Sequence, residues 1–308
     1  MTRDDARLAS TLCGISLRNP VLAASGTFAY GIEFERLVDL NELGGVVVKG
    51  LSRKPMDGNP PPRLWETHAG MLNSVGLQNI GVQAFVRDQL PRLAGFRTAV
   101  IANVFGYSTE DYVEVVRVLE SAEGLAAYEL NVSCPNTRQG GIYFSSDPAL
   151  LAEVVEAVKR VARRPLIVKL SPNVAAIEPL ARAAESSGAD AISLVNTFIA
   201  LAVDARARRP RLGAGFGGLS GPAIKPIALR LVYQAAQAVK IPVIGLGGIA
   251  TGEDAAEFLV AGASAVQVGT ATFWEPGRPV RVARELGQFL REENIGNVRE
   301  IVGTLQWT

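Results

Sequence analysis

Short runs of apolar, often β-branched residues recur along the chain and alternate with segments of helical periodicity. Eight of these runs predict strands, at residues 21–24, 45–49, 99–104, 126–132, 166–170, 189–196, 242–247 and 265–269. Their near-continuous apolar character is typical of parallel strands that are buried on both faces. A (β/α)8 TIM barrel is the simplest closure of eight such strand–helix units, and it is the predicted α/β fold.

Helical stripes lie between the predicted strands. One stripe consists of Leu151, Val154, Val155, Val158 and Val161, and a second consists of Ile224, Ile227, Leu231, Ala235 and Val239. Apolar residues at this spacing share one face of an α-helix. Each stripe is therefore predicted to cover the barrel from outside.

The chain departs from a plain barrel at its start and in two insertions. Residues 8–12 and 15–17 predict a short N-terminal β-hairpin at the barrel bottom, with Cys13 as a packing residue in its turn. The connections 51–79 and 197–220 are long for barrel loops and predict lids or interfaces over the C-terminal face. Because no linker, repeat or low-complexity stretch interrupts the pattern, residues 1–308 are predicted to form a single domain.

Composition excludes several classes of function. Hydrophobic residues make up 48% and charged residues 20% of the chain, and the net charge of +1 provides no field that would attract nucleic acid or a membrane. No apolar run is long enough to span a bilayer, and the first residues lack the apolar core of a secretion signal. Two cysteines and a single histidine, His68, offer no disulfide framework and no metal cluster, so a cytoplasmic protein without bound metal is expected.

The second cysteine follows a predicted strand directly. Cys134 lies in the sequence Asn131-Val132-Ser133-Cys134-Pro135-Asn136, after the apolar run 126–132. Because proline stops the strand from continuing, the thiol is expected in a loop, between two asparagines in the sequence. A thiol in this position is a candidate acid/base or nucleophile, whereas a core cysteine would more often lie inside the strand.

Small or polar residues follow every predicted strand. In TIM barrels the active site lies at the C-terminal ends of the strands, so these residues are expected to line one polar pocket. They are Ser25-Gly26, Lys49-Gly50, Asn103, Asn131, Lys169, Asn196-Thr197, Gly247-Gly248 and Gly269-Thr270.

Two of these strand ends carry glycine where barrels often bind phosphate. Gly247-Gly248 and Gly269-Thr270 follow the seventh and eighth strands, where backbone N–H groups and a helix N-terminus can hold a phosphate. Ordinary tight turns are the alternative interpretation. The glycine-rich run 213–218 follows a basic stretch rather than a strand, so it does not predict a dinucleotide-binding loop.

Lysine and asparagine side chains supply most of the polar groups of the expected pocket. Lys49 and Lys169 can stabilise negative charge there, unless they extend into solvent instead. An amide lining would suit a flat ligand edged with imide and carboxylate groups, since each amide offers a donor and an acceptor. The candidate amides are Asn73, Asn79, Asn103, Asn131, Asn136 and Asn196.

Taken together, these motifs resemble the dihydroorotate dehydrogenases, which are FMN enzymes of pyrimidine synthesis built on a (β/α)8 barrel. The resemblance covers essentially the whole chain. It rests on residues 24–28 (ASGTF), 48–50 (VKG), 72–79 (LNSVGLQN), 131–136 (NVSCPN), 218–223 (GLSGPA) and 245–249 (GLGGI). Cysteine in the fourth of these motifs resembles class 1 of the family. Gln78, together with residues 140–142 and 147–148, is most similar to the NAD-linked 1B catalytic subunits.

The resemblance implies a role for each motif residue. FMN would be held by Ser25, Lys49, Gly50, Asn103, Asn131, Lys169, Val195, Gly221, Gly247, Gly248, Gly269 and Thr270. Dihydroorotate would be held by Lys49, Asn73, Ser74, Val75, Gly76, Leu77, Asn131, Asn196 and Thr197. Cys134 would be the base that removes the C5 proton of (S)-dihydroorotate while hydride passes from C6 to FMN, which yields orotate.

The same resemblance implies how electrons leave the site. In a 1B enzyme of de novo pyrimidine (UMP) biosynthesis they would reach NAD+ through a partner subunit that carries FAD and a [2Fe–2S] cluster. The barrel would form a homodimer, and the full assembly a heterotetramer. The alternatives are a fumarate-linked 1A enzyme, another FMN-barrel pyrimidine reductase, and a non-enzymatic phosphate-ligand-binding barrel. The basic run 206–211 is expected to be solvated or to dock a partner, and His68 to serve a loop or a subunit interface.

Overall fold

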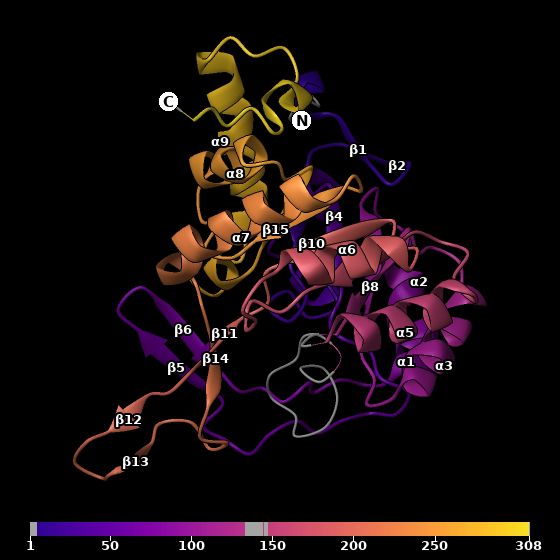
Figure 1. Ribbon diagram of the computed structural model, residues 1–308, viewed down its shortest axis with the longest axis vertical. Helices are drawn as coiled ribbons and strands as arrows, with labels where there is room; N and C mark the ends of the chain where they lie inside the picture. The colour runs from indigo at the N-terminus through magenta and orange to yellow at the C-terminus, as the bar shows by residue number, and fades with distance from the viewer. Residues whose placement is uncertain (1–4, 133–143, 145–146, 308) are drawn as a thin grey trace.

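The computed structural model describes residues 5–132, 144 and 147–307, and its centre is a closed parallel barrel in the spatial order β10-β15-β16-β3-β4-β7-β8-β9 (Figure 1). The barrel strands are β3 (Val21–Ala23), β4 (Gly45–Val47), β7 (Ala99–Val104), β8 (Ala127–Asn131), β9 (Leu166–Lys169), β10 (Ala191–Leu194), β15 (Val243–Leu246) and β16 (Ala265–Val268). Each of the eight predicted strands is present. The predicted TIM barrel is confirmed.

Helices surround this barrel. The α-helices of the described residues are α1 (Val82–Ala84), α2 (Leu90–Leu93), α3 (Thr109–Glu120), α5 (Pro148–Lys159), α6 (Glu178–Ser186), α7 (Lys225–Ala238), α8 (Gly252–Val260) and α9 (Arg278–Glu292). A π-helical stretch, η4 (Phe85–Gln89), joins α1 to α2. Short 3-10 turns are η1 (Ala6–Leu8), η2 (Ile32–Phe34), η3 (Leu40–Glu42), η5 (Pro222–Ile224), η6 (Thr270–Phe273) and η7 (Val298–Ile301). None of the helices described is both long and apolar enough to cross a membrane.

The structure confirms one of the two predicted helical stripes and corrects the other. The first is confirmed on α5, where Leu151, Val154, Val155 and Val158 are buried. The second is wrong at Ile227, whose side chain is 43% exposed on α7. Ala228 is buried against the barrel instead. It lies so close to the end of β15 that a Cβ added to Gly247 would be 2.7 Å from the Ala228 Cβ.

The N-terminal hairpin closes the bottom of the barrel, as predicted. It consists of antiparallel β1 (Ser10–Leu12) and β2 (Ile15–Leu17). Leu12 and Leu17 pack against an apolar ring to which every barrel strand contributes a residue. The ring consists of Leu22, Val47, Ile101, Ala127, Ile167, Ala191, Ile244 and Ala265.

Cys13 in the hairpin turn is expected to react slowly with thiol reagents. Its thiol donates to the Asp190 carbonyl oxygen at 3.2 Å, and burial, aided by the Asp190 charge, raises the pKa of the thiol from 9.0 to about 11. At pH 8 the folded protein then holds about 100-fold less Cys13 thiolate, the reactive form, than the unfolded chain. Iodoacetamide labelling of a Cys134→Ser variant, folded and in urea, should differ by about that factor. Equal labelling rates would contradict the buried position.

The two insertions fold into one small sheet. Its strands are β5 (Leu64–Thr67), β6 (Gly70–Asn73), β11 (Phe198–Ala200) and β14 (Gly217–Ser220), in the order β11-β14-β6-β5. Pairing of β6 with β14 joins the two insertions, with Leu72 opposite Leu219. A two-stranded ribbon of β12 (Val203–Asp204) and β13 (Arg209–Pro210) projects from this lid sheet (Figure 1). The basic run 206–211 therefore lies at an exposed tip, where Arg211 pairs with Asp204 at 2.8 Å.

Candidate active site

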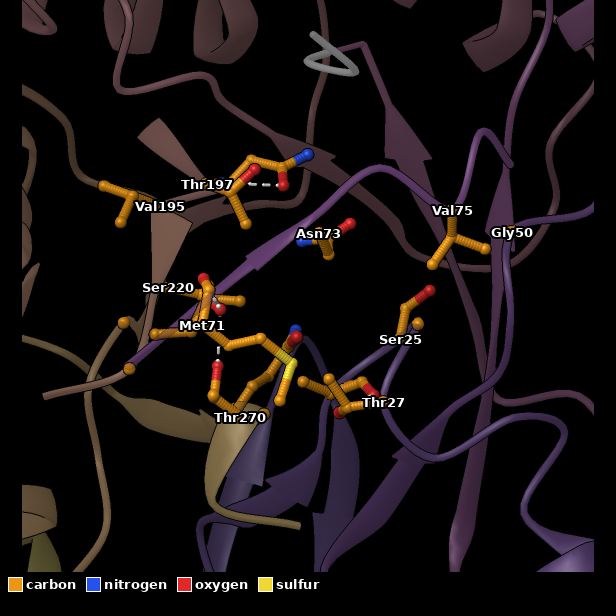
Figure 2. Close-up of a pocket in the computed structure, with 18 of the residues that line it drawn as sticks. Ser25, Thr27, Gly50, Met71, Asn73, Val75, Val195, Thr197, Ser220 and Thr270 are labelled. Atoms are coloured by element: carbon orange, nitrogen blue, oxygen red, sulfur yellow. Dashed lines mark hydrogen bonds between the residues drawn. The ribbon is translucent and has the colours of Figure 1, made fainter. Parts of the chain in front are cut away.

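A pocket opens at the C-terminal ends of the barrel strands, next to the lid sheet (Figure 2). Its volume, including the open mouth, is about 1140 Å³. Most of the predicted site residues line it. They are Ser25, Lys49, Gly50, Asn73, Val75, Gly76, Leu77, Asn131, Lys169, Val195, Asn196, Thr197, Gly221, Gly247, Gly248, Gly269 and Thr270.

A ring of mostly polar residues lies in the barrel directly above the apolar ring. Side chains alternate along a strand, so the residue two positions beyond each apolar ring residue also points into the barrel. These eight residues, here named the polar layer, are Ala24, Lys49, Asn103, Glu129, Lys169, Ser193, Leu246 and Gln267. Glu129, Ser193 and Gln267 were not predicted as site residues, because each lies inside an apolar run rather than at its end.

Glu129 on β8 is the centre of the polar layer and is fully buried. Its Oε1 accepts from Asn103 Nδ2 at 2.7 Å and lies 3.5 Å from Lys169 Nζ. Its Oε2 accepts from Ser193 Oγ at 2.8 Å and from Gln267 Nε2 at 2.6 Å. Lys169 therefore does not extend into solvent. Its side chain is 6% exposed and ends at the pocket floor.

Three predicted residues lie behind the pocket wall instead of in it. Asn103 is covered by Gly50, where an added Cβ would lie 2.9 Å from Asn103 Oδ1. Ser74 Oγ accepts from the Asn59 amide at 2.8 Å, and Asn79 Oδ1 accepts from the Gly81 backbone N–H at 2.8 Å. Ser74 and Asn79 thus stabilise the loop around the pocket and are not part of the pocket lining.

The remaining amides meet at one side of the pocket. Asn196 Nδ2 lies 3.4 Å from Asn131 Oδ1, and Asn196 Oδ1 accepts from the Thr197 backbone N–H at 2.8 Å. The Tyr112 hydroxyl donates to the Asn131 carbonyl oxygen at 2.9 Å, which fixes the backbone at the end of β8. Cys134 and Asn136 lie outside the described residues, and Cys134 follows Asn131 by three positions in the sequence.

The glycines after β15 offer their backbone to the pocket, but the helix that follows does not. Gly247 and Gly248 have φ values of +127° and +83°, a conformation that favours glycine. The first turn of α8 is already bonded within the protein. Asp254 Oδ2 accepts from the backbone N–H groups of Ala250 and Thr251, both at 2.8 Å, and Glu285 Oε2 accepts from Gly252 N at 2.9 Å. A phosphate here would meet the loop glycines rather than the N-terminus of α8.

The charge of Asp254 is well stabilised in this first turn of α8. Burial opposes its ionisation, but hydrogen bonds from Lys225 and from the two backbone groups outweigh burial and lower the pKa of the carboxyl group. Lys225 Nζ lies 2.6 Å from Asp254 Oδ1. This carboxylate therefore stays bound to the helix start at neutral pH and keeps anionic ligands away from it.

The lid sheet contributes residues that the sequence analysis did not identify. Met71 of β6 and Ser220 of β14 line the pocket, and the Thr270 hydroxyl donates to Ser220 Oγ at 2.8 Å (Figure 2). This bond joins the lid to the end of β16. Thr27, Leu64, Ile224 and Phe273 also line the pocket. Nothing local in the sequence indicates which lid residues reach the barrel, because the pairing of β6 with β14 spans the middle of the chain.

Comparison with known proteins identifies the family. The family model described as dihydroorotate dehydrogenase matches residues 7–290. The chain belongs to the dihydroorotate dehydrogenase family. The resemblance found in the sequence motifs is thereby confirmed, and with it dihydroorotate dehydrogenase activity and a family that depends on FMN.

Similar dihydroorotate dehydrogenases carry two different names. A protein of Solibacter usitatus, provisionally named dihydroorotate dehydrogenase A (fumarate), is 77% identical over 301 residues, which is 98% of this chain and 99% of the relative. Proteins of Geobacter sp. (strain M21) and Thermodesulfovibrio yellowstonii are 51% identical over 306 residues and 52% identical over 292 residues. These alignments cover 99% and 95% of this chain, and 100% and 96% of the relatives. Both are named dihydroorotate dehydrogenase B (NAD(+)), catalytic subunit.

A solved structure supports the fold. The crystal structure of dihydroorotate dehydrogenase from Eimeria tenella in complex with ferulenol aligns with a TM-score of 0.82 and 24% identity. The alignment covers 99% of this chain and 90% of that one. The similarity establishes the same barrel architecture.

Proposed function

We propose that this dihydroorotate dehydrogenase binds one FMN in the barrel pocket and uses it to oxidise (S)-dihydroorotate to orotate in de novo pyrimidine (UMP) biosynthesis. The observation that carries the proposal is the floor of the pocket, where a buried cation, Lys169, lies near a buried carbonyl oxygen, Gln267 Oε1, that has no hydrogen-bond partner among the described residues. An unsatisfied buried acceptor is costly unless a ligand supplies a donor. The pyrimidine edge of a flavin has both a ring N–H and carbonyl oxygens that accept from a cation.

The rest of the pocket fits the other end of FMN. Gly247, Gly248, Gly269 and Thr270 lie together at the ends of β15 and β16 and line the pocket. Backbone N–H groups of such turns commonly hold phosphate in barrels of this kind. FMN, when bound, supplies the hydride acceptor for the reaction, and the protein supplies orientation and charge.

Dihydroorotate would bind beside the flavin among the amides. Asn73, Asn131 and Asn196 line the pocket with Thr197 and with Lys49, a partly buried cation. These groups can polarise the carbonyl next to C5 and bind the substrate carboxylate, which lowers the barrier to removal of the C5 proton. Cys134 is proposed as the base. Support comes from its position three residues after Asn131 and from the pKa of a free thiol, about 8.5, which lies nearer neutrality than that of a hydroxyl.

We infer that the electrons leave to NAD+ through a partner subunit with FAD and a [2Fe–2S] cluster. Relatives at 51–52% identity are named as catalytic subunits of NAD(+) enzymes, which favours a second kind of subunit. Ile199, Leu201, Val203 and Phe216, on or next to the lid sheet and its ribbon, are each between 47% and 62% exposed. Exposed apolar side chains gathered in this way favour a protein contact, in keeping with a homodimer within a cytoplasmic heterotetramer. The name of the Solibacter relative supports fumarate as the alternative acceptor.

The purified chain is expected to be yellow, and its flavin to lose absorbance when dihydroorotate is added without oxygen. The reason is that the pocket would hold FMN next to the substrate amides. Absorbance at the flavin band, followed anaerobically, measures the reaction, and a redox-inactive analogue of the substrate serves as the control. A colourless chain that takes up no added FMN would contradict the proposal and favour a phosphate-ligand-binding barrel.

A further inference from the structure

Every partner of the Glu129 carboxylate is a donor. Asn103 and Gln267 turn their amide nitrogens toward it, at 2.7 and 2.6 Å, while the Ser193 hydroxyl lies at 2.8 Å and the Lys169 ammonium at 3.5 Å. An ionised carboxylate can only accept hydrogen bonds. Glu129 therefore determines which end of each amide faces the interior of the polar layer.

The opposite ends of the two amides are left as acceptors. Asn103 Oδ1 and Gln267 Oε1 are buried and have no hydrogen-bond partner among the described residues. Rotating either amide by 180° would not give its oxygen a hydrogen-bond donor. The oxygen would then face the Glu129 carboxylate, which has only acceptors. Gln267 is one of the residues that line the pocket, whereas Asn103 lies behind Gly50, so Gln267 is the one of these two amides that lies next to the space a ligand would fill.

Glu129 also fixes the charge of the pocket floor. The side chains of Glu129 and Lys169 are 0% and 6% exposed, and they come from the neighbouring strands β8 and β9. In such a buried position a charge is weakly screened, so the carboxylate both holds Lys169 in place and offsets much of its positive field.

We propose that Glu129 is a positioning residue for the flavin: it orients Gln267 as the acceptor for the ring N–H of the flavin, and it sets the charge that Lys169 presents to the same ring. The inference rests on the proposed binding of FMN in this pocket. It separates into two effects. Gln267 Oε1 accepts from the ring N–H, which is present in oxidised and reduced flavin alike, so this hydrogen bond affects the affinity for FMN. The charge acts on the negative charge gained on reduction, so it affects the reduction potential.

Three variants separate these effects. Glu129→Gln replaces an acceptor oxygen by a donor, which forces one facing amide to turn, and it removes the negative charge. Gln267→Met removes the pocket acceptor and keeps the Glu129–Lys169 pair. Glu120→Gln is the matched control, since Glu120 is another ion-paired carboxylate, 3.1 Å from Arg164, with a side chain only 14% exposed. It is the last residue of α3 and lies at the amino-terminal end of the barrel, away from the pocket. Apoprotein titration with FMN gives the affinity, and anaerobic dye equilibration gives the potential.

Glu129→Gln is expected to bind FMN at least tenfold more weakly and to shift the two-electron reduction equilibrium at least tenfold toward reduced flavin, which is about 30 mV upward. Gln267→Met should lose affinity to a similar degree with little change in potential, and Glu120→Gln should change neither property by more than twofold. A folded Glu129→Gln variant with wild-type affinity and potential would overturn the inference, as would an equal shift in Glu120→Gln.

If Glu129→Gln fails to fold, the FMN affinity of Gln267→Met decides, since unchanged binding there would refute the assigned acceptor. The proposed function fails in a different way. A wild-type apoprotein that takes up no FMN would overturn both proposals. A wild-type protein that binds FMN, together with variants that bind and reduce it equally well, would overturn only the role of Glu129.

Discussion

Replacing Cys134 with alanine is expected to leave a folded, FMN-containing protein whose flavin is reduced by dihydroorotate about 10²–10⁴-fold more slowly than in the wild type. Loss of a general base typically costs this much, because the C5 proton must then leave to water. Asn73, Asn131 and Asn196, which line the pocket and are proposed to bind the substrate, remain in the variant, so its affinity for orotate should stay close to that of the wild type. Anaerobic stopped-flow measurement of flavin absorbance separates the two quantities.

The chain offers a matched control for this experiment. Cys13→Ala removes the other cysteine, which lies in the hairpin at the barrel bottom, where its thiol contacts the Asp190 carbonyl oxygen. That variant should reduce its flavin at the wild-type rate. Cys134→Ser should recover activity only at raised pH, since a hydroxyl gives up its proton less readily than a thiol. A wild-type rate of flavin reduction in Cys134→Ala would exclude the thiol as the base.

The barrel was predictable because its signal is local. Each strand is a short apolar run, and the residue after the run must lie at the rim of the barrel, so Lys169, Asn131 and Gly248 could be placed in the pocket from spacing alone. The hairpin plug was equally readable, since Leu12 and Leu17 alternate with polar neighbours as a half-buried ribbon does.

The polar layer was not predictable in this way, because its logic is not local. Glu129 stands inside an apolar run, where a charge is tolerated only when other strands provide donors. Those donors come from Asn103, Lys169, Ser193 and Gln267, on four other strands. The period of two could have indicated the position, since Glu129 lies two residues before the predicted Asn131. Its partners could be known only from the closed barrel.

The lid shows the same limit at longer range. Residues 72–79 contain four polar side chains that the motif alone cannot distinguish, yet of these only Asn73 lines the pocket. Ser74 and Asn79 bond within the loop, and Gln78 Oε1 accepts from Arg63 at 2.6 Å. The choice is made by the pairing of β6 with β14, which sets Asn73 opposite Gly218. A single register between segments so far apart in the sequence determines which amide the ligand meets.

The isolated chain is expected to reduce an artificial dye with dihydroorotate but to reduce NAD+ little or not at all. The described residues contain no second dinucleotide site: Gly247 and Gly248 belong to the barrel pocket, and Gly217 and Gly218 lie in β14 of the lid sheet rather than in a strand–turn–helix unit. The chain has two cysteines, whereas an iron–sulfur cluster normally takes four. NAD+ reduction should therefore require a partner with FAD and a [2Fe–2S] cluster.

Steady-state assays can decide between the fumarate-linked and the NAD-linked assignment that the names of its relatives suggest. NAD+, fumarate and a dye are tested as acceptors, with the chain alone and with the chain co-purified with such a subunit. Turnover with NAD+ only in the presence of the partner supports the 1B assignment. Rapid fumarate reduction by the lone chain would favour the 1A assignment, in line with the relative that is 77% identical. Rapid NAD+ reduction by the lone chain would overturn the partner proposal, because NAD+ would then accept the electrons without a second subunit.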